Sequence, residues 1–381
     1  MPRRIAIVGS AQSKFKSKLA DQHYGELIYK AVMKALEDTG IGIEDIDTVV
    51  SASCDMLDGR SISNVFVAEA MGAFLKEETK VEEDGSFAAV YTFMRLLSGA
   101  FDTAMIVAYS KGSESHPHFY TGLQTDPHFL RPLDLDDLTV GALQANVYMN
   151  RYGVTGEQCA KVAVKNRKNG SKNPYAVLRK EVSLDEVMKS PVLASPIREL
   201  EAYPVTDGVC VVIMAAEEKA KKMTGAPAWI TGAGHIMDGF YPGHRDLAEL
   251  KGLRKAAGDA YRAAGIKNPL GQIDVAEVSE SFAYQELMIC EALGLCGPGE
   301  GGKLIDGGKT EMGGALPVNP SGGALCANPF MATGLVRIAE AALQVSGMAG
   351  ERQVPGAKTA LAHGSSGLGL MANAVVILSK D

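Results

Sequence analysis

The sequence lacks paired cysteines, long apolar runs and an excess of basic residues. Its six cysteines are scattered without a CxxC pair, which argues against a zinc site, so we expect no metal in this chain and a reducing, cytoplasmic setting. No apolar run approaches membrane-spanning length, and MPRRIAIVGS leads directly into a predicted strand, so we expect neither a signal peptide nor an anchor. The net charge of −7 argues against nucleic acid as the main partner.

The 381 residues, with 46% hydrophobic and 22% charged side chains, are typical of a globular protein large enough for two core-sized units. Two glycine-rich stretches stand out within this composition. They are Pro317–Gly334, PVNPSGGALCANPFMATG, and His363–Gly369, HGSSGLG. Because glycine and proline interrupt regular elements, we expect each stretch to contain a loop of defined backbone shape. Such loops on a rigid scaffold often carry catalytic side chains.

The predicted elements follow the same order twice. In the first half, a buried strand at Ile5–Gly9 precedes a helical pattern at 25–39 and a β-rich run, IDTVVSAS. The stretch from Trp229 repeats this order, which predicts a duplicated α/β unit with buried parallel strands. A polar segment lies between the halves. We therefore predict a first half at 1–116 with 201–225, an inserted segment at 117–200, and a second half at 226–381.

Six runs lie along the chain in a familiar order: IDTVV, SGAFDTAMIVA, VTDGVCVVIMAAEEKA, VSESFAYQEL, NPSGG with NPFMATG, and HGSSGLG. Together they resemble the thiolase superfamily. The likeness is strongest to its lipid-transfer or sterol-carrier branch, which includes benzoylsuccinyl-CoA thiolase and steroid side-chain aldolases. The resemblance implies a five-layered αβαβα fold, an inserted loop domain covering coenzyme A, and a homodimer. It also implies a separate zinc-finger/OB-fold partner subunit, since this chain has no zinc motif.

A thiolase makes or breaks the Cα–Cβ bond of a 3-oxoacyl-CoA with a thiolate nucleophile, a base and two oxyanion holes. By resemblance, Asp84 occupies the position of the nucleophilic cysteine, ahead of a predicted buried helix. We expect Asp84 either to cap that helix or to act as a base or orienting carboxylate. Cys326 is the one cysteine within a matched motif. It is either a displaced nucleophile or a small buried residue.

The second and third catalytic motifs of the family also carry substitutions here. Ser279 and Glu280 match the second motif. Ser279 could hold a water or a substrate oxygen, or be ordinary loop polarity, and we expect Glu280 to orient the site. Asn328 stands where the third motif has histidine. An asparagine can donate a hydrogen bond to a developing oxyanion, but it cannot accept a proton.

His363 matches the fourth motif, at the position of an acid/base cysteine. Its ordinary pKa suits proton transfer near neutral pH, although a structural role is the alternative. By resemblance, the N–H groups of Ser365 and Asp84 would form the second oxyanion hole. The candidate contacts for coenzyme A are Arg167, Lys168, Ser321 and Gly322.

The sequence therefore predicts a coenzyme-A-dependent, thiolase-like acyltransferase that acts on a 3-oxoacyl-CoA in a catabolic pathway. Because Asp84 replaces the nucleophile, two alternatives stay open. One is a retro-aldolase acting on a 3-hydroxyacyl-CoA without an acyl-enzyme, and the other is a catalytically silent subunit of a larger complex. The candidate acids for the aldolase are Tyr91, Tyr109, Tyr241 and Tyr284.

Overall fold

The computed structural model describes residues 3–380. Its central feature is a mixed sheet with the strand order β3-β2-β4-β7-β1-β8-β11-β10-β9. The strands are β1 (Ile5–Gln12), β2 (Thr48–Ala52), β3 (Glu77–Val81), β4 (Thr103–Lys111), β7 (Asp207–Ala216), β8 (Ala228–Met237), β9 (Val275–Glu277), β10 (Thr359–Ser366) and β11 (Ala372–Ser379). The first half supplies β1 to β4 and β7, and the second half supplies the rest. The halves join where Ala6 pairs with Trp229 and Ile7 with Ala228.

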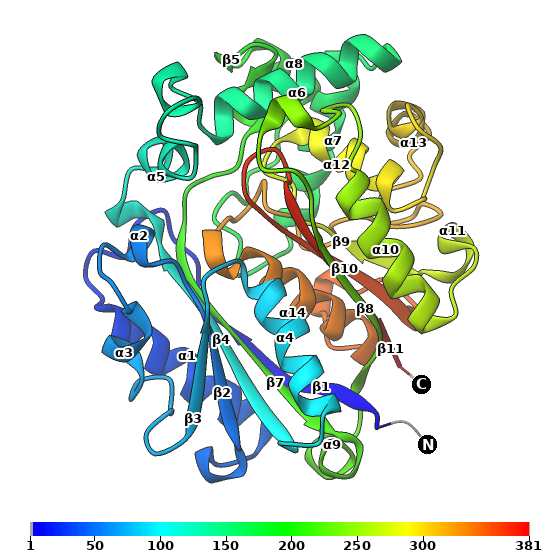
Figure 1. The fold of residues 1–381 in the computed structure, drawn as a ribbon. Coiled ribbons are helices and arrows are strands. Elements are labelled where there is room, and N and C mark those ends of the chain that lie inside the picture. The colour runs from blue at the N-terminus through cyan, green and yellow to red at the C-terminus, as the bar shows by residue number, and fades with distance from the viewer. Residues whose placement is uncertain (1–2, 381) are drawn as a thin grey trace.

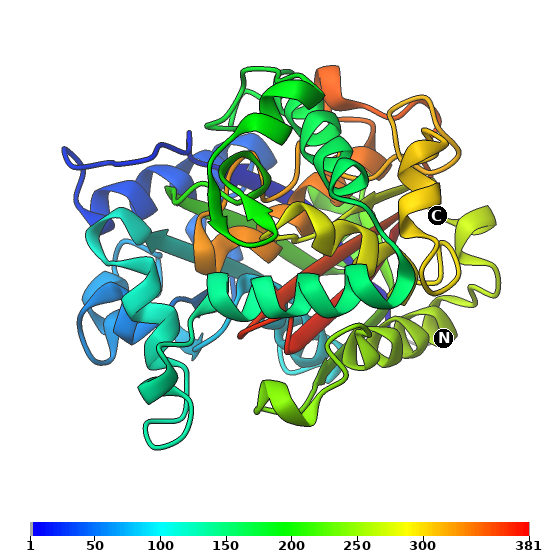
Figure 2. The same cartoon turned by 90° about the horizontal axis from the view of Figure 1, so that it is seen from above.

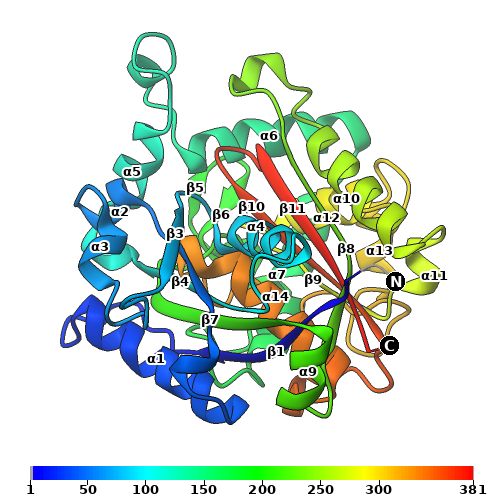
Figure 3. The same cartoon turned by 60° about the horizontal axis from the view of Figure 1, so that its bottom comes forward.

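Helices lie outside both parts of the sheet and also between them, as Figures 1 and 3 show. The outer layers contain α1 (Tyr24–Thr39) and α9 (Glu217–Met223) on the first half, and α10 (Lys251–Ala264) and α12 (Ala283–Ala292) on the second. The middle layer contains α4 (Gly85–Leu97) and α14 (Thr333–Ser346), which pack on strands of both halves. This order confirms the predicted duplicated αβαβα fold. The predicted parallel arrangement holds only for the pairs β2–β3, β2–β4 and β9–β10, whereas the other neighbouring strands are antiparallel.

The inserted region lies at the top of Figure 1, and Figure 2 looks down on it. Its elements are α5 (Pro117–Leu123), α6 (Asp137–Tyr152), α7 (Gly156–Gly170), α8 (Leu184–Lys189), β5 (Val192–Ala194) and β6 (Ile197–Arg198). On α6, Gln144 Nε2 donates to Gly369 O at 3.2 Å and so ties the region to the turn between β10 and β11. The domain boundaries themselves stay a prediction.

Short helices complete the chain: α2 (Asp55–Asp58), α3 (Ser63–Val67), α11 (Pro269–Gln272) and α13 (Gly301–Asp306). Within residues 3–380, no helix combines the length and apolar character needed to cross a membrane.

Small residues bring the two middle helices close together. A Cβ atom on Gly85 would lie 2.7 Å from Leu335 Cβ and 2.8 Å from Ala108 Cβ. Gly85 begins α4, so the start of this helix can approach both α14 and β4 only without a side chain. This close approach places the two N-termini at one point.

We expect Gly85→Ala to lower the free energy of unfolding by about 1–3 kcal/mol, because the added methyl group would overpack this contact. Gly258→Ala on α10 is the matched control, since a methyl group there meets no neighbour within 4 Å. That control should change stability by less than about 1 kcal/mol, in the stabilising direction. Urea denaturation followed by circular dichroism measures both variants. Equal effects would contradict the close approach of the helices.

Candidate active site

Asp84 lies where the N-termini of the two middle helices meet. It is the N-cap of α4, and its Oδ1 accepts hydrogen bonds from Ser86 N–H at 2.8 Å and from Ser86 Oγ at 2.6 Å. Its Oδ2 accepts from Gly334 N–H, in the first turn of α14, at 2.7 Å. A Cβ atom on Gly334 would lie 1.9 Å from Asp84 Oδ1, so this approach requires glycine. The predicted capping role of Asp84 agrees with this geometry.

The Asp84 carboxyl group is also placed to exchange a proton. Burial raises its pKa to about 6, an effect that the three hydrogen bonds oppose and the neighbouring Glu83 charge reinforces. The positive ends of two helix dipoles favour the anion. Asp84 is therefore largely ionised at neutral pH, yet it remains a stronger base than an ordinary aspartate.

Asp84, Ser279, Asn328 and Ser365 line one cavity of about 100 Å³. The structure thus brings together four predicted site residues from different parts of the chain. The inserted region closes the same cavity with Tyr120, Thr121, Gln124 and Asp137. None of the chain's cysteines lines it.

Asn328 presents a hydrogen-bond donor at this cavity. Thr333 Oγ1 donates to Asn328 Oδ1 at 2.5 Å, so the amide oxygen is already occupied. The Nδ2 group has no partner among the described residues. Asn328 can therefore donate to a substrate oxygen, as its proposed oxyanion role requires.

Ser279 and Ser365 lie side by side on the cavity wall. Ser365 Oγ contacts the Ser279 carbonyl oxygen at 3.4 Å. Ser279 Oγ is buried and has no partner within residues 3–380. Because a buried hydroxyl without a partner costs free energy, it is a natural contact for a substrate or a water. That the N–H groups of Ser365 and Asp84 form an oxyanion hole stays a prediction.

His363 lies behind Ser279 and does not line the cavity. Its Nδ1 accepts from Ser279 N–H at 3.4 Å, and its Nε2 lies 3.0 Å from Asn373 Oδ1. Asn373 Nδ2 donates to Leu370 O at 2.9 Å, so Asn373 Oδ1 is the acceptor and His363 Nε2 carries the proton. Burial lowers the pKa of His363 to about 4. This geometry favours positioning of Ser279 over the predicted acid/base role.

Cys326 lies away from the cavity, fully buried beside α7. Its Sγ donates to Asn166 O at 3.2 Å, and burial raises its pKa to about 12. A protonated, enclosed thiol is a poor nucleophile. Of the two roles considered for Cys326, this geometry favours that of a small buried residue over that of a displaced nucleophile.

The four candidate contacts for coenzyme A do not form one surface. Ser321 is buried, where its Oγ donates to Glu277 Oε2 at 2.6 Å. Gly322 has φ of 94°, and its Cβ would lie 2.7 Å from Gly170 Cα, so it permits close contact with α7. Arg167 is buried, whereas Lys168 lines a separate cavity. A direct role for these residues stays a prediction, and the burial of Ser321 and Arg167 disfavours it.

Glu280 anchors the Pro317–Gly334 loop from beneath. Its Oε1 accepts from Asn166 Nδ2 at 3.0 Å and from Leu325 N–H at 3.2 Å, and its Oε2 accepts from Asn319 Nδ2 at 2.8 Å. Burial, reinforced by the nearby Glu286 charge, raises the pKa of Glu280 to about 8. Glu280 accepts three hydrogen bonds that anchor the loop, and it does not line the cavity. Its orienting role stays a prediction.

Tyr203 and Asp137 are a hydrogen-bonded pair of titratable residues on the cavity wall, which sequence reasoning missed. Tyr203 Oη donates to Asp137 Oδ2 in a short hydrogen bond, and Thr121 Oγ1 donates to Asp137 Oδ1 at 3.0 Å. Burial raises the pKa of both groups. Neither residue belongs to a matched motif. Tyr203 lies in the segment that leads into β7, and Asp137 is the first residue of α6.

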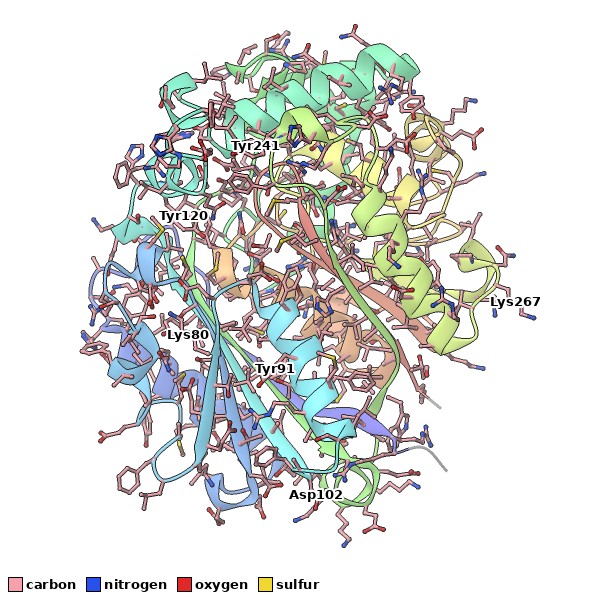
Figure 4. The ribbon with its side chains drawn as sticks, viewed as in Figure 1. Lys80, Tyr91, Asp102, Tyr120, Tyr241 and Lys267 are labelled. Atoms are coloured by element: carbon pink, nitrogen blue, oxygen red, sulfur yellow. The ribbon has the colours of Figure 1, made fainter. Side chains whose placement is uncertain are left out.

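None of the four tyrosines proposed from the sequence lines this cavity; they are Tyr91, Tyr109, Tyr241 and Tyr284. In Figure 4, Tyr120 and Tyr241 lie in the upper part of the view, toward the inserted region, whereas Tyr91 lies on α4 below them. The tyrosines that do reach the cavity are Tyr120 and Tyr203.

His118, Asp136 and Asp137 come close enough to hold a metal ion, a grouping the sequence spacing did not indicate. Contacts within the chain account for it. His118 Nδ1 lies 2.5 Å from Asp136 Oδ2, and Asp136 Oδ1 caps α6 by accepting from Thr139 N–H at 2.7 Å.

Stability should depend on pH through His363. Its pKa is lower in the folded state than its ordinary value of about 6.5, so its contribution is complete above that value and lost as the pH falls toward 4. Between pH 7 and 5, we expect wild type to lose about 2 kcal/mol more of its unfolding free energy than His363→Gln. Urea denaturation at both pH values measures the difference. Parallel losses would show that His363 is not buried in its neutral form.

Comparison with known proteins assigns the family. Residues 241–380 match the model described as "Thiolase C-terminal domain-like". The acetyl-CoA acetyltransferase of Methanothermobacter thermautotrophicus is 31% identical over 99% of this chain and 100% of its own length. Sterol carrier protein 2 of Oryctolagus cuniculus is 39% identical over 61% of this chain and 43% of its own length. The solved Ltp2-ChsH2(DUF35) aldolase superposes with a TM-score of 0.86 at 24% identity, over 99% of this chain and 98% of the other. The chain therefore belongs to the thiolase superfamily, in its lipid-transfer and sterol-carrier branch.

Proposed function

We propose that this thiolase-like chain breaks or forms the Cα–Cβ bond of a 3-hydroxyacyl-CoA by a retro-aldol reaction without an acyl-enzyme. One observation carries the proposal: the cavity where the helix N-termini meet holds a carboxylate, Asp84, and no cysteine. Acyl transfer needs a thiolate there to hold the acyl group. An aldol cleavage needs only proton transfers and stabilisation of an enolate.

In the cleavage direction, Asp84 takes the proton of the substrate's 3-hydroxyl group. A carboxylate offers about four acceptor positions, and three are filled by Ser86 and Gly334, so one is left for this proton. The Cα–Cβ bond then breaks, and its electron pair moves onto the thioester as an enolate. The hydroxyl carbon leaves as an aldehyde or ketone. Asn328 Nδ2 would donate to the thioester oxygen as negative charge develops on it.

The enolate carbon must then be protonated, and the Tyr203–Asp137 pair is the proposed source. Both residues line the cavity, and the Tyr203 hydroxyl group donates to the Asp137 carboxyl group. Asp137 would take up a proton from solvent and so restore the proton that Tyr203 gives to the substrate. One proton is taken by Asp84 and one is returned to Cα, so the reaction consumes neither water nor free coenzyme A. Coenzyme A enters only as part of the thioester substrate and product.

The requirement for free coenzyme A distinguishes this reaction from thiolysis. We expect a 3-hydroxyacyl-CoA to yield a carbonyl product and a shortened acyl-CoA with no added coenzyme A, as followed by mass spectrometry. The rate should rise with pH through about 6, because Asp84 must be ionised. Asp84→Asn and Tyr203→Phe should each lower kcat/KM by about 10²–10⁴-fold.

Tyr91→Phe is the matched control for these variants, since it removes a hydroxyl group that lies outside the cavity. It should retain wild-type activity. The contrary result is cleavage of a 3-oxoacyl-CoA that requires free coenzyme A and leaves labelled acyl groups on the protein. It would contradict the aldol proposal and indicate a thiolase reaction. No turnover of either substrate by the chain with its native partners would favour the silent subunit.

A homodimer and a separate zinc-finger/OB-fold subunit are further proposals. Exposed apolar side chains support an interface beside the edge strand β3: Ile62, Val65, Phe66, Phe74 and Leu75. Light scattering should give a mass of twice 40.2 kDa for the purified chain, and a larger mass after co-purification from the native host. A fully active species of 40.2 kDa would remove both proposals.

A further inference from the structure

A second cavity, of about 250 Å³, adjoins the cavity at Asp84. The residues common to both walls are Tyr120, Gln124, Met331, Ser366, Gly367 and Leu368. A ligand that reacts at Asp84 can therefore extend a chain into the second cavity.

The walls of the second cavity combine apolar side chains and the Cys54 thiol with the polar groups of Gln124, Thr125 and Ser366 and two acidic groups. The apolar residues that belong to it alone include Met56, Leu130, Phe240, Pro242 and Met371. Glu82 and Glu83 lie on the same wall. No lysine or arginine lines either cavity. The phosphates of coenzyme A favour cationic side chains, which the second cavity lacks.

The two carboxylates differ in how they are neutralised. Glu82 lies 2.6 Å from Lys80 Nζ, and its Oε1 accepts from Asp55 N–H at 2.6 Å. Glu83 is half-buried and has no hydrogen-bond or ion-pair partner among the described residues. Burial raises the pKa of the Glu83 carboxyl group, and in its ionised form the charge acts on whatever enters the cavity. A second anion beside it is disfavoured, because like charges repel more strongly in a partly dehydrated space.

We propose that the second cavity binds the acyl chain of the substrate, and that Glu83 makes it select uncharged apolar chains over chains that end in a carboxylate. The inference rests on the proposed function for the orientation of the substrate, and it names the substrate class. Glu83 is thus a specificity-determining residue, one position before Asp84.

Binding of unreactive thioesters tests the proposal separately from catalysis. Octanoyl-CoA and 7-carboxyheptanoyl-CoA have eight-carbon chains that differ in a terminal carboxylate, and neither has a 3-hydroxyl group. By calorimetry at pH 7.5, we expect wild type to bind octanoyl-CoA at least tenfold more tightly. Glu83→Gln should reduce that ratio by about tenfold, the effect of removing one like charge, with little change for octanoyl-CoA.

Two further variants sharpen the result. Glu44→Gln removes an exposed charge outside both cavities and should leave the ratio unchanged. Met371→Lys adds a cation to the same wall and should shift the preference toward the carboxylated chain. An unchanged ratio in Glu83→Gln, or equal binding of both thioesters by wild type, would overturn the proposal even if aldol cleavage is observed. Selective binding without cleavage would support the chain pocket and count against the reaction.

Discussion

The carboxylate of Asp84 holds the start of α4 and the start of α14 at one point, and the rest of the site depends on this contact. Two backbone N–H groups and one hydroxyl group donate to it. The contact requires glycine at positions 85 and 334, because a side chain at either would displace its neighbours. The duplicated sheet carries the helices, but this three-bond junction aligns them. It joins the two halves of the chain where the cavity opens.

The same contact sets the chemistry. Two helix N-termini supply positive potential, while burial makes the carboxylate more basic than an ordinary aspartate. A thiol could use this potential to become a thiolate, but an aspartate uses it to remain ionised in a buried place. A carboxylate there can exchange protons, and its acyl derivatives would be short-lived anhydrides. Proton transfer at Asp84, donation from Asn328 and a second proton at Tyr203 are consistent with one another in a single cavity.

The duplicated α/β order could be predicted because its signals are local and repeated: buried strands and helical periodicity occur in the same order in both halves. The five layers followed from the resemblance to the thiolase superfamily. Asp84, Ser279, Asn328 and Ser365 could be expected near one another because they match the motifs of the thiolase superfamily, and they line one cavity. The directions of side chains could not be predicted. His363, in β10, and Cys326, in the Pro317–Gly334 loop, lie in matched motifs, yet their side chains turn into the protein, where burial keeps the imidazole neutral and the thiol protonated. The meeting of Tyr203 and Asp137 at the cavity depends on how the inserted region folds over it, and no local sequence pattern predicts that arrangement.

A crystal structure of the Asp84→Asn variant with 3-hydroxyoctanoyl-CoA tests this account most directly. We predict the 3-hydroxyl group within hydrogen-bond distance of position 84, the thioester oxygen at Asn328 Nδ2, and the alkyl chain beside Glu83 in the second cavity. A thioester bound with its reacting carbons elsewhere, or an acyl group bonded to a cysteine, would contradict the assignment of Asp84 as the base of a reaction without an acyl-enzyme.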